Sequence, residues 1–437
     1  MSKNCLSEAA RPPESATTGP AQRRRRVLFV AEAITLAQVV RLVSLAESLP
    51  PAEFEVSFAC GEFDDVAFAG TRLKPLPIFT IERGQALRRV ERGERIYEKD
   101  VLARYVEEEL GLLDSVRPDF VVGDFRLSLP ISAQRAGIPH ASLINAYFSE
   151  HAERDGFPVP EHPIVSLIGA ARAARYLPRA LPAVFAHFVA PIDAVRRRYG
   201  LEPSGGLLAA LAAGDFALHP DVPELCPLQN APAKHRYLGH IPWSPQLPLP
   251  DFWRHLPGGA PLVYVTLGSS GRISALKAVL AVLGELPVVA VVASAGRFTL
   301  DERPPNVFFA DYVPGDVVAS AASFVVTNGG ASTSYQALAA GRPVLGIPSN
   351  LDQYLAMTAI ERAGAGRLVR SGEATATAVR RALLELLESD ALRAGAQAVQ
   401  AAFARVDYRA RFRAVVDEAT QHVRGATESA RHEEQHA

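Results

Sequence analysis

The stretch that decides the fold lies in the C-terminal half and reads Phe324-Val325-Val326-Thr327-Asn328-Gly329-Gly330-Ala331-Ser332-Thr333-Ser334. Its first four residues form a short, strand-favouring run of the kind that is buried on both faces of a sheet. A polar turn with two glycines follows, and the residues after the turn can open a helix. The stretch therefore predicts a strand, a tight turn and a helix, the repeating unit of an α/β protein with a parallel sheet.

The same alternation continues on both sides of this stretch. Apolar runs that predict strands occupy residues 27–31, 54–59, 120–124, 141–144, 262–267, 288–292, 307–310 and 343–347. Segments with a helical pattern separate them, including 37–48, 96–115 and 276–283. A chain of 437 residues exceeds what one core usually serves, because domains average about 100–200 residues. We therefore predict the α/β class, with two Rossmann-like domains of doubly wound parallel sheets that face a central cleft.

The order of these segments divides the chain into five parts. Residues 1–24 are rich in Ser, Ala, Pro and Thr and end in a basic run, which predicts a disordered basic tail. Residues 25–230 and 261–405 form the two predicted domains. The segment 231–260 is rich in proline and lacks periodicity, which is typical of an interdomain linker. Residues 406–437 are expected to form a helix that ends in a frayed, charged tail.

The composition excludes several classes of protein. Hydrophobic residues make up 48% of the chain, and the formal net charge of −1 gives no overall attraction to nucleic acid. The cysteines Cys5, Cys60 and Cys226 are too scattered for a metal cluster and too few for a disulfide framework. A globular protein of the reducing cytoplasm fits these numbers.

Two segments raise the question of a membrane. The basic run 23–26 precedes the apolar run 27–31 as in a signal peptide, but Glu32 interrupts it and a buried first strand explains the same residues. No stretch reaches the roughly 18 uninterrupted apolar residues of a membrane-spanning helix.

The segment 157–199 is apolar and punctuated by proline, and it carries arginines at near-helical spacing. These are Arg172, Arg175 and Arg179. The segment is interpreted either as surface helices with charged faces or as a loop in peripheral contact with a membrane.

Three polar turns follow predicted strands of the C-terminal domain. Gly268-Ser269-Ser270-Gly271 and the turn within 327–334 each precede a helix, whose N-terminal NH groups can bind a phosphate without a metal ion. The first of them could also be an ordinary tight turn. In the third, Asp352 and Gln353 form a carboxylate and amide pair that suits vicinal sugar hydroxyls, although Asp352 alone could be a helix cap. Because ligands bind beyond the carboxyl ends of parallel strands, the turns should share one crevice.

Residues 324–366 resemble the donor-binding signature of the UDP-glycosyltransferase superfamily, whose members have the GT-B fold. In that family the pattern is His-Gly-Gly, a Ser or Thr three residues on, Glu-Ala-Leu, a stretch with Gly-x-Pro and a second Pro, and Asp-Gln. The corresponding residues here are Asn328-Gly329-Gly330, Thr333, Gln336-Ala337-Leu338, Gly341-Arg342-Pro343, Pro348 and Asp352-Gln353. Weaker similarity extends over residues 27–369 and is closest to bacterial antibiotic and lipid glycosyltransferases.

The resemblance implies a role for each matching residue. Tyr312 would stack on the nucleotide base, and Val313 would bond the base edge through its backbone. Gln336 would bind ribose hydroxyls, and Asp352 with Gln353 would hold the donor sugar. The diphosphate would be held by Gly268, Ser269, Ser270, Gly271, Gly329, Gly330 and Thr333. The family works without a metal ion, so no metal or cofactor is expected beyond the nucleotide-sugar itself.

The donor signature departs from the family at two positions. Asn328 replaces the histidine of His-Gly-Gly, so a neutral donor faces the leaving diphosphate where the family can place a positive charge. Gln336 replaces the ribose-binding glutamate, which keeps one acceptor oxygen and loses the charge. We therefore expect donor affinity or donor identity to differ from the family.

A third departure concerns the general base. Gln38 falls where the family has its catalytic histidine, and glutamine cannot take a proton. Asp124 matches the aspartate that partners this histidine, and it could act directly, or Glu32 could act from the neighbouring strand end, since burial raises the pKa of a carboxyl group. Asp124 could equally be a helix cap. Histidines in later loops could also replace the base, namely His140, His151 and His162.

The resemblance predicts an inverting, metal-independent glycosyltransferase that moves a hexose from a UDP- or dTDP-sugar to a hydrophobic small-molecule or lipid acceptor. The alternative is a catalytically degenerate relative that acts as an auxiliary partner and still binds nucleotide-sugar, because Gln38, Asn328 and Gln336 depart from the family. A dehydrogenase is disfavoured, since no Gly-x-Gly-x-x-Gly follows the first strand. The exact sugar, the acceptor and the oligomeric state stay open.

Overall fold

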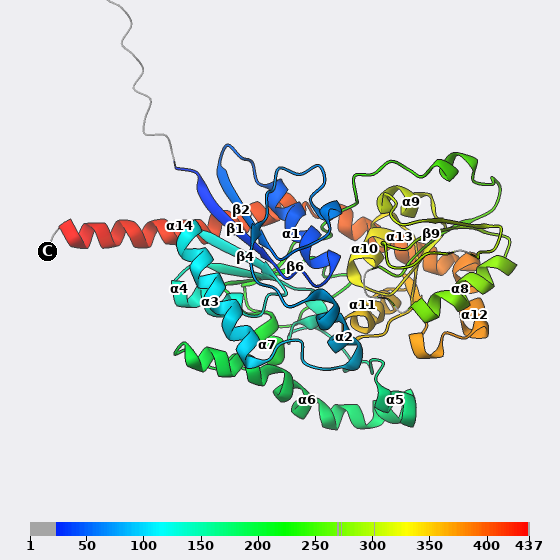
Figure 1. Cartoon of the computed structure of the whole chain (residues 1–437), viewed down its shortest axis with the longest axis horizontal. Coiled ribbons are helices and arrows are strands. Elements are labelled where there is room, and N and C mark those ends of the chain that lie inside the picture. Colours follow the sequence, from blue (N-terminus) through cyan, green and yellow to red (C-terminus); the bar gives the residue numbers. More distant parts are fainter. Residues whose placement is uncertain (1–22, 269–270, 272, 301, 436–437) are drawn as a thin grey trace, which may run out of the picture.

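The computed structural model describes residues 23–268, 271, 273–300 and 302–435, with side chains described as far as residue 421. Two all-parallel sheets lie next to each other along the long axis of the molecule (Figure 1). The first has the strand order β3-β2-β1-β4-β5-β6-β7, and the second has the order β10-β9-β8-β11-β12-β13. Both contain the 3-2-1-4-5-6 order of a doubly wound nucleotide-binding sheet. The predicted α/β fold with two Rossmann-like domains is confirmed.

The N-terminal sheet is built from short apolar strands that alternate with helices. Its strands are β1 (Arg25–Ala31), β2 (Phe54–Cys60), β3 (Leu76–Pro77), β4 (Phe120–Asp124), β5 (His140–Leu143), β6 (Phe216–His219) and β7 (His235–Tyr237). The helices are α1 (Leu36–Ser48), α2 (Arg83–Arg92), α3 (Lys99–Val116), α4 (Leu129–Ala136), α5 (Pro163–Ile168), α6 (Ala170–Arg198) and α7 (Leu207–Leu211), with 3-10 turns η1 (Asp65–Ala67) and η2 (Ala146–Phe148). Strands β1 and β4 are almost wholly buried because helices cover both faces of the sheet.

The C-terminal sheet repeats this plan. Its strands are β8 (Leu262–Thr266), β9 (Val289–Ala293), β10 (Val307–Ala310), β11 (Phe324–Thr327), β12 (Val344–Gly346) and β13 (Gly366–Leu368). The helices are α8 (Ile273–Glu285), α9 (Gly315–Ala321), α10 (Ala331–Ala339), α11 (Leu351–Arg362), α12 (Ala376–Glu388), α13 (Asp390–Ala404) and α14 (Tyr408–Gln435), with 3-10 turns η3 (Asp251–His255) and η4 (Ser371–Glu373). The deciding stretch forms β11, its turn and α10, as the sequence predicts.

Two parts of the predicted boundaries differ from the structure. Strand β7 lies inside the segment 231–260 that we expected to be linker, and it pairs with β6 as the edge of the first sheet. Its three residues, His-Arg-Tyr, are short and polar, so no apolar run marks them. The last charged residues were expected to fray, yet α14 continues to Gln435.

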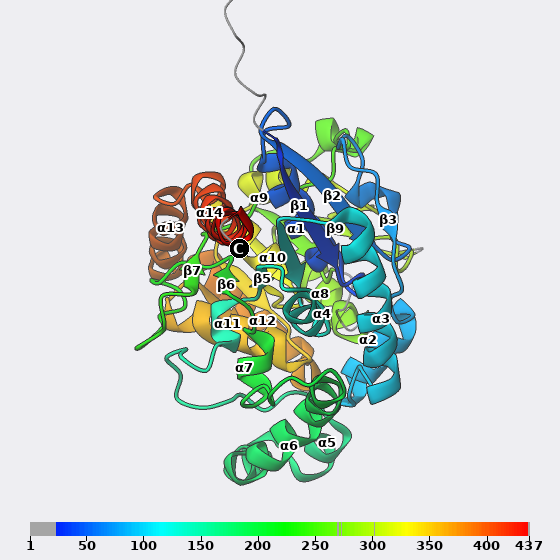
Figure 2. The same ribbon diagram turned by 90° about the vertical axis from the view of Figure 1, so that its left-hand side faces the viewer.

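Helix α14 returns to the first domain after the chain has completed the second (Figures 1 and 2). The ring of Phe412 lies 5.9 Å from the ring of Phe29 in β1, and Val415 and Val416 are buried in the same core. An ion pair joins Arg25 to Asp417 at this seam. Helix α14 therefore packs into the core around β1, so the C-terminal end of the chain connects the second domain back to the first.

Candidate active site

The carboxyl ends of the C-terminal strands open into a pocket between the two domains. Its floor and donor-side wall include Gly268, Tyr312, Val313, Asn328, Thr333, Gln336 and Asp352. The facing wall comes from the start of α1, with Thr35, Leu36, Ala37 and Val40, and from the linker, with His240, Ile241, Trp243 and Pro245. The predicted central cleft is thus present at the switch points of the sheets, where ligands of doubly wound folds bind.

Most residues expected to bind the donor meet in this pocket. Gly329 and Gly330 stand between the pocket residues Asn328 and Thr333, at the N-terminal end of α10. Ser269 and Ser270 lie outside the described residues. The side chain of Gln353 is buried, and its Oε1 accepts hydrogen bonds from the backbone NH and the hydroxyl of Ser349 at 2.8 and 3.1 Å. Gln353 thus shapes the loop before α11, and it is not among the pocket-lining residues.

Hydrogen bonds inside the turn fix the conformation of Gly329 and Gly330. Gly329 has a φ of +80°, and an added Cβ would lie 2.7 Å from Met357 Cγ, so glycine is required there. Thr327 Oγ1 accepts a hydrogen bond from the NH of Gly329 at 2.7 Å, and Asn328 Oδ1 accepts one from the NH of Gly330 at 3.1 Å. Asn328 therefore braces the turn in addition to facing the pocket.

Arg297 supports the other turn, and the sequence analysis did not single it out. Its guanidinium donates hydrogen bonds to the carbonyl oxygens of Gly268 and Gly271 at 3.1 and 2.8 Å. Burial lowers the pKa of Arg297. A cation at this turn adds positive charge where a diphosphate is expected, beside the partial positive charge of a helix N-terminus.

Tyr312 contributes an aromatic ring to the pocket. The hydroxyl of Tyr312 donates to the carbonyl oxygen of Ala295 at 3.2 Å, which holds the ring beside Gly296. Gln336 donates through Nε2 to the carbonyl oxygen of Trp243 at 3.1 Å. The residue expected to bind ribose is therefore joined to the linker between the domains.

Asp352, which the resemblance assigns to the donor sugar, is contacted from the other domain. Its Oδ1 accepts a hydrogen bond of 2.8 Å from the hydroxyl of Tyr147 in η2. Burial raises the pKa of Asp352, while the Tyr147 hydrogen bond and the charge of Arg41 oppose this rise. Asn350, and not Asp352, caps α11, so the alternative interpretation of Asp352 as a helix cap is wrong.

Asp124 is fully buried and bound on both oxygens by Arg41. Arg41 donates from Nε to Oδ2 and from NH2 to Oδ1, each at 2.8 Å, and from NH1 to Asn145 Oδ1 at 2.7 Å. Burial raises the pKa of Asp124 to about 6 against the opposing charge of Arg41. Helix α4 has Ser128 at its N-cap position, so the helix-cap interpretation of Asp124 is also wrong. The next residue, Phe125, has a φ of +56°, a strained value for an aromatic residue at the switch point of the sheet.

Gln38 has a structural role at the start of α1. Its Oε1 accepts a hydrogen bond from the NH of Thr35 at 2.9 Å, which forms one half of a capping box. Gln38 therefore positions the turn whose residues Thr35, Leu36 and Ala37 form part of the pocket wall. It contacts neither Asp124 nor Glu32 by any hydrogen bond described here.

Comparison with known proteins agrees with this geometry. Residues 275–406 match the family described as Erythromycin biosynthesis protein CIII-like, C-terminal domain. The chain is 42% identical over 390 residues to a PGL/p-HBAD biosynthesis glycosyltransferase of Mycobacterium tuberculosis (strain ATCC 25177 / H37Ra), over 89% of this chain and 91% of the relative. The chain is a glycosyltransferase of the UDP-glycosyltransferase superfamily.

Further relatives of the glycosyltransferase extend the comparison. It is 44% identical over 392 residues to a PGL/p-HBAD biosynthesis rhamnosyltransferase of Mycobacterium bovis (strain BCG / Pasteur 1173P2), over 89% of this chain and 87% of the relative. A protein named inactive PGL/p-HBAD biosynthesis glycosyltransferase from the same strain is 40% identical over 271 residues, 62% of this chain and 74% of the relative. The solved structure of spinosyn rhamnosyltransferase SpnG complexed with thymidine diphosphate has the same fold, with a TM-score of 0.65, 18% identity, and coverage of 90% and 100%.

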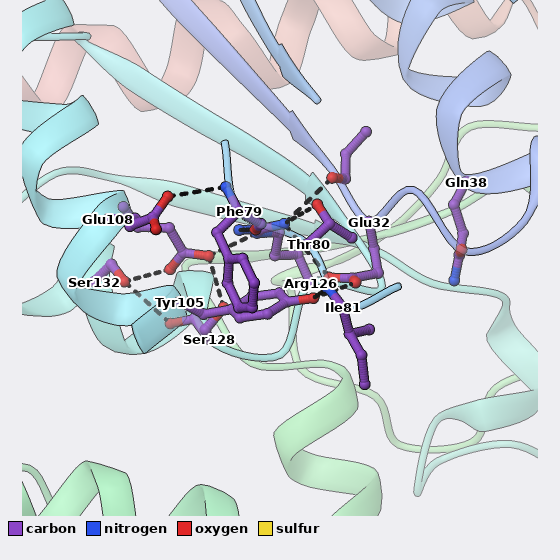
Figure 3. Close-up of polar contacts among 12 residues, drawn as sticks. Glu32, Gln38, Phe79, Thr80, Ile81, Tyr105, Glu108, Arg126, Ser128 and Ser132 are labelled. Atoms are coloured by element: carbon purple, nitrogen blue, oxygen red, sulfur yellow. Dashed lines mark hydrogen bonds and ion pairs between the residues drawn. The ribbon is translucent and has the colours of Figure 1, made fainter. Parts of the chain in front are cut away.

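Glu32 of the glycosyltransferase is buried in a cluster inside the first domain (Figure 3). Tyr105 donates to Glu32 Oε1 at 2.9 Å, and Arg126 lies 3.6 Å from Oε2. Arg126 is closer to Glu109, at 2.6 Å, and that carboxylate also accepts from Ser128 and Ser132. Glu32 is not among the residues that line the pocket. The suggestion that it reaches the acceptor from the strand end is therefore not supported by its position.

Replacement of Glu32 by glutamine is expected to flatten the pH dependence of stability. Burial raises the pKa of Glu32 from 4.5 to about 7. Its contribution to stability is therefore fully present below pH 4.5 and is lost as the pH rises through about 7. The loss amounts to roughly 3 kcal/mol in the free energy of unfolding. Urea titrations at about pH 5 and about pH 8 should show a smaller difference for Glu32→Gln than for the parent protein.

Glu107→Gln is the matched control, because Glu107 is an exposed carboxylate on α3. It should leave the difference between the two pH values unchanged. Equal differences in all three proteins would show that Glu32 does not titrate in this range.

The three histidines considered as alternative bases occupy positions outside the pocket lining. His140 is buried at the start of β5, and its pKa is lowered to about 3, first by burial and then by Lys234. His162 caps α5 by accepting from the NH of Ile164, and His151 packs edge-on against the ring of His235. None of His140, His151 and His162 lines the pocket, whereas His240 of the linker does.

Proposed function

We propose that this glycosyltransferase moves a hexose, with inversion and without a metal ion, from a UDP- or dTDP-linked donor to a hydrophobic small-molecule or lipid acceptor. One observation carries the proposal. A single pocket is lined by an aromatic ring, by residues at the N-terminus of a helix and by a buried carboxylate, which come from Tyr312, α10 and Asp352. This combination of groups suits the base, the diphosphate and the sugar of one donor molecule.

Several features support this choice of donor. The turns at Gly268 and Gly329 present backbone next to a helix end, and Arg297 adds a cation, so the negative diphosphate can be neutralised without a metal ion. The protein SpnG, which shares the fold, is known as a complex with thymidine diphosphate. A relative that is 44% identical is named a rhamnosyltransferase, which favours a deoxyhexose among the donor sugars to be tested.

The acceptor enters from the wall opposite the donor. Leu36, Ala37 and Val40 make this wall largely apolar, which favours a hydrophobic acceptor. The acceptor oxygen attacks the anomeric carbon in line with the bond that breaks, and the nucleoside diphosphate leaves with the electron pair. The acceptor proton passes to a base. Asp124 stays the candidate because it matches the family's aspartate, although, like Glu32, it is not among the residues that line the pocket. We also propose a cytoplasmic location, supported by the buried, unpaired thiols of Cys60 and Cys226.

A second candidate function is an auxiliary protein that binds nucleotide-sugar without turnover. Two observations favour it: Arg41 occupies both oxygens of Asp124, and a 40% identical relative is named inactive. Turnover separates this candidate from the enzyme.

Titration calorimetry with UDP-, dTDP- and GDP-sugars, followed by acceptor assays with the best binder, tests both candidates. We expect binding in the micromolar range, since a few charged and stacking contacts typically give dissociation constants of about that order. Transfer that depends on the donor sugar would establish the enzyme. Binding without transfer would favour the auxiliary protein, and an absence of binding to every nucleotide-sugar would overturn the assignment of the pocket.

A further inference from the structure

Helices α5 and α6 form an arm that projects from the first domain (Figures 1 and 2). The end of α6 is anchored, because Val189, Ile192 and Val195 are buried in the core that also contains residues of α3. The beginning is different: within the described stretch 170–188, Ala173 is the only buried residue. The arm therefore presents about two thirds of a long helix, and all of α5, to the surroundings.

The arm exposes large apolar side chains. Leu167 is 85% exposed, Ile164 59% and Tyr176 58%, while the exposed large apolar residues outside the arm reach at most 42%. Val184 of the arm is 38% exposed as well. Isolated exposed apolar residues are common on proteins, but a contiguous group marks a surface that binds another apolar phase or partner.

The charge of the arm has one sign. Arg172, Arg175 and Arg179 follow one another at helical spacing on α6, and the stretch 163–192 contains no Asp or Glu. Tyr176 stands four residues after Arg172 and three before Arg179, so its ring shares their face of the helix. A helix with basic and apolar side chains and no acid matches the headgroups and the acyl boundary of an anionic bilayer.

We propose that α5 and residues 170–188 of α6 form a docking surface for a lipid bilayer that contains anionic lipid. The surface lies on the bilayer and does not cross it, since among the described residues no helix is both long and apolar enough to span a membrane. The apolar side chains of Ile164, Leu167 and Tyr176 enter the interface, and the arginines bind lipid phosphates. The proposal does not depend on the transfer reaction.

The root of the arm is fastened to the rim of the pocket. The NH of Glu161 donates to the carbonyl oxygen of Ser349 at 3.0 Å, in the loop that leads to Asp352. The carboxylate of Glu161 accepts from the hydroxyl of Tyr354 at 2.6 Å and lies 2.8 Å from Arg370 of the second domain. If the proposed function with a lipid acceptor holds, docking of the arm brings the pocket close to that acceptor.

Flotation of the full chain with vesicles tests the surface. We expect binding to vesicles of phosphatidylcholine mixed with phosphatidylglycerol and about tenfold or more weaker binding to phosphatidylcholine alone. The triple variant Arg172→Glu, Arg175→Glu, Arg179→Glu should lower binding to the mixed vesicles by about a hundredfold or more. Ile164→Glu with Leu167→Glu should lower it about tenfold or more at every lipid composition, because it removes the apolar insertion.

The control variant is Leu247→Glu with Val317→Glu, which changes two exposed apolar residues outside the arm and should bind vesicles as the parent protein does. All variants should keep the parent affinity for the best nucleotide-sugar, which separates loss of docking from loss of the donor site. Equal flotation of the arm and control variants, or no flotation of the parent protein, would overturn the proposal. Self-association in sedimentation velocity that Leu167→Glu abolishes would instead assign the arm to a second copy of the chain.

Discussion

Replacing Asp352 by alanine is expected to abolish transfer, with a loss of kcat/KM of at least a hundredfold. The proposed function has this buried carboxylate accept hydrogen bonds from two sugar hydroxyls, and each such bond to a charged group contributes about 1.5–3 kcal/mol. Asp352 lines the pocket, and the charge of Arg41 helps to keep it ionised against burial. Steady-state rates with the preferred donor, and calorimetric titration of the same donor, measure the two components of the loss.

Tyr147→Phe is the matched control for this prediction. Both variants lose the hydrogen bond between Tyr147 and Asp352, which joins the two domains, but only Asp352→Ala loses the carboxylate. We expect Tyr147→Phe to lower kcat/KM much less than Asp352→Ala does, by roughly tenfold, since it removes one hydrogen bond to the carboxylate, worth about 1.5 kcal/mol, and keeps the carboxylate itself. If both variants lose activity equally, the interdomain contact and not sugar binding is the function of Asp352.

The fold could be predicted because each central strand is marked by an apolar run in its own residues. Apolar runs at 120–124, 324–327 and 262–267 are bounded by turns, and each forms a strand in the structure. The edge strand β7 escaped prediction because an edge needs little burial, so its three residues carry no apolar pattern. The position of α14 could not be read from its own residues either, since its partners Arg25 and Phe29 lie at the other end of the chain.

The donor half of the site was more predictable than the acceptor half. Tyr312, Gln336 and Asp352 belong to one domain and follow strands in a recognisable order, and all of them line the pocket. Tyr147 comes from the other domain and meets Asp352 only when the chain is folded. The sequence could have predicted a buried partner for Arg41. This arginine stands three residues after Gln38 in an otherwise apolar part of α1, and a charged side chain in such a place needs a partner of opposite charge.

Asp124→Asn is expected to have a second large effect, of about a hundredfold or more on kcat, if Asp124 takes the acceptor proton. It should also destabilise the protein by about 3–5 kcal/mol, because it removes the ion-pair partner of the buried guanidinium of Arg41. The pKa of about 6 adds a signature in the parent enzyme. A base must be deprotonated to act, so kcat should fall as the pH drops through about 6.

The double variant Arg41→Met with Asp124→Leu separates the two roles. Replacing both members of a buried ion pair by apolar residues of similar size is often neutral for stability, so the free energy of unfolding should return close to the parent value. If Asp124 is the base, turnover stays about a hundredfold low in this stable protein. Recovery of turnover together with stability would show that the pair only positions α1 and the pocket wall, and an unchanged rate for Asp124→Asn would exclude Asp124 from the mechanism.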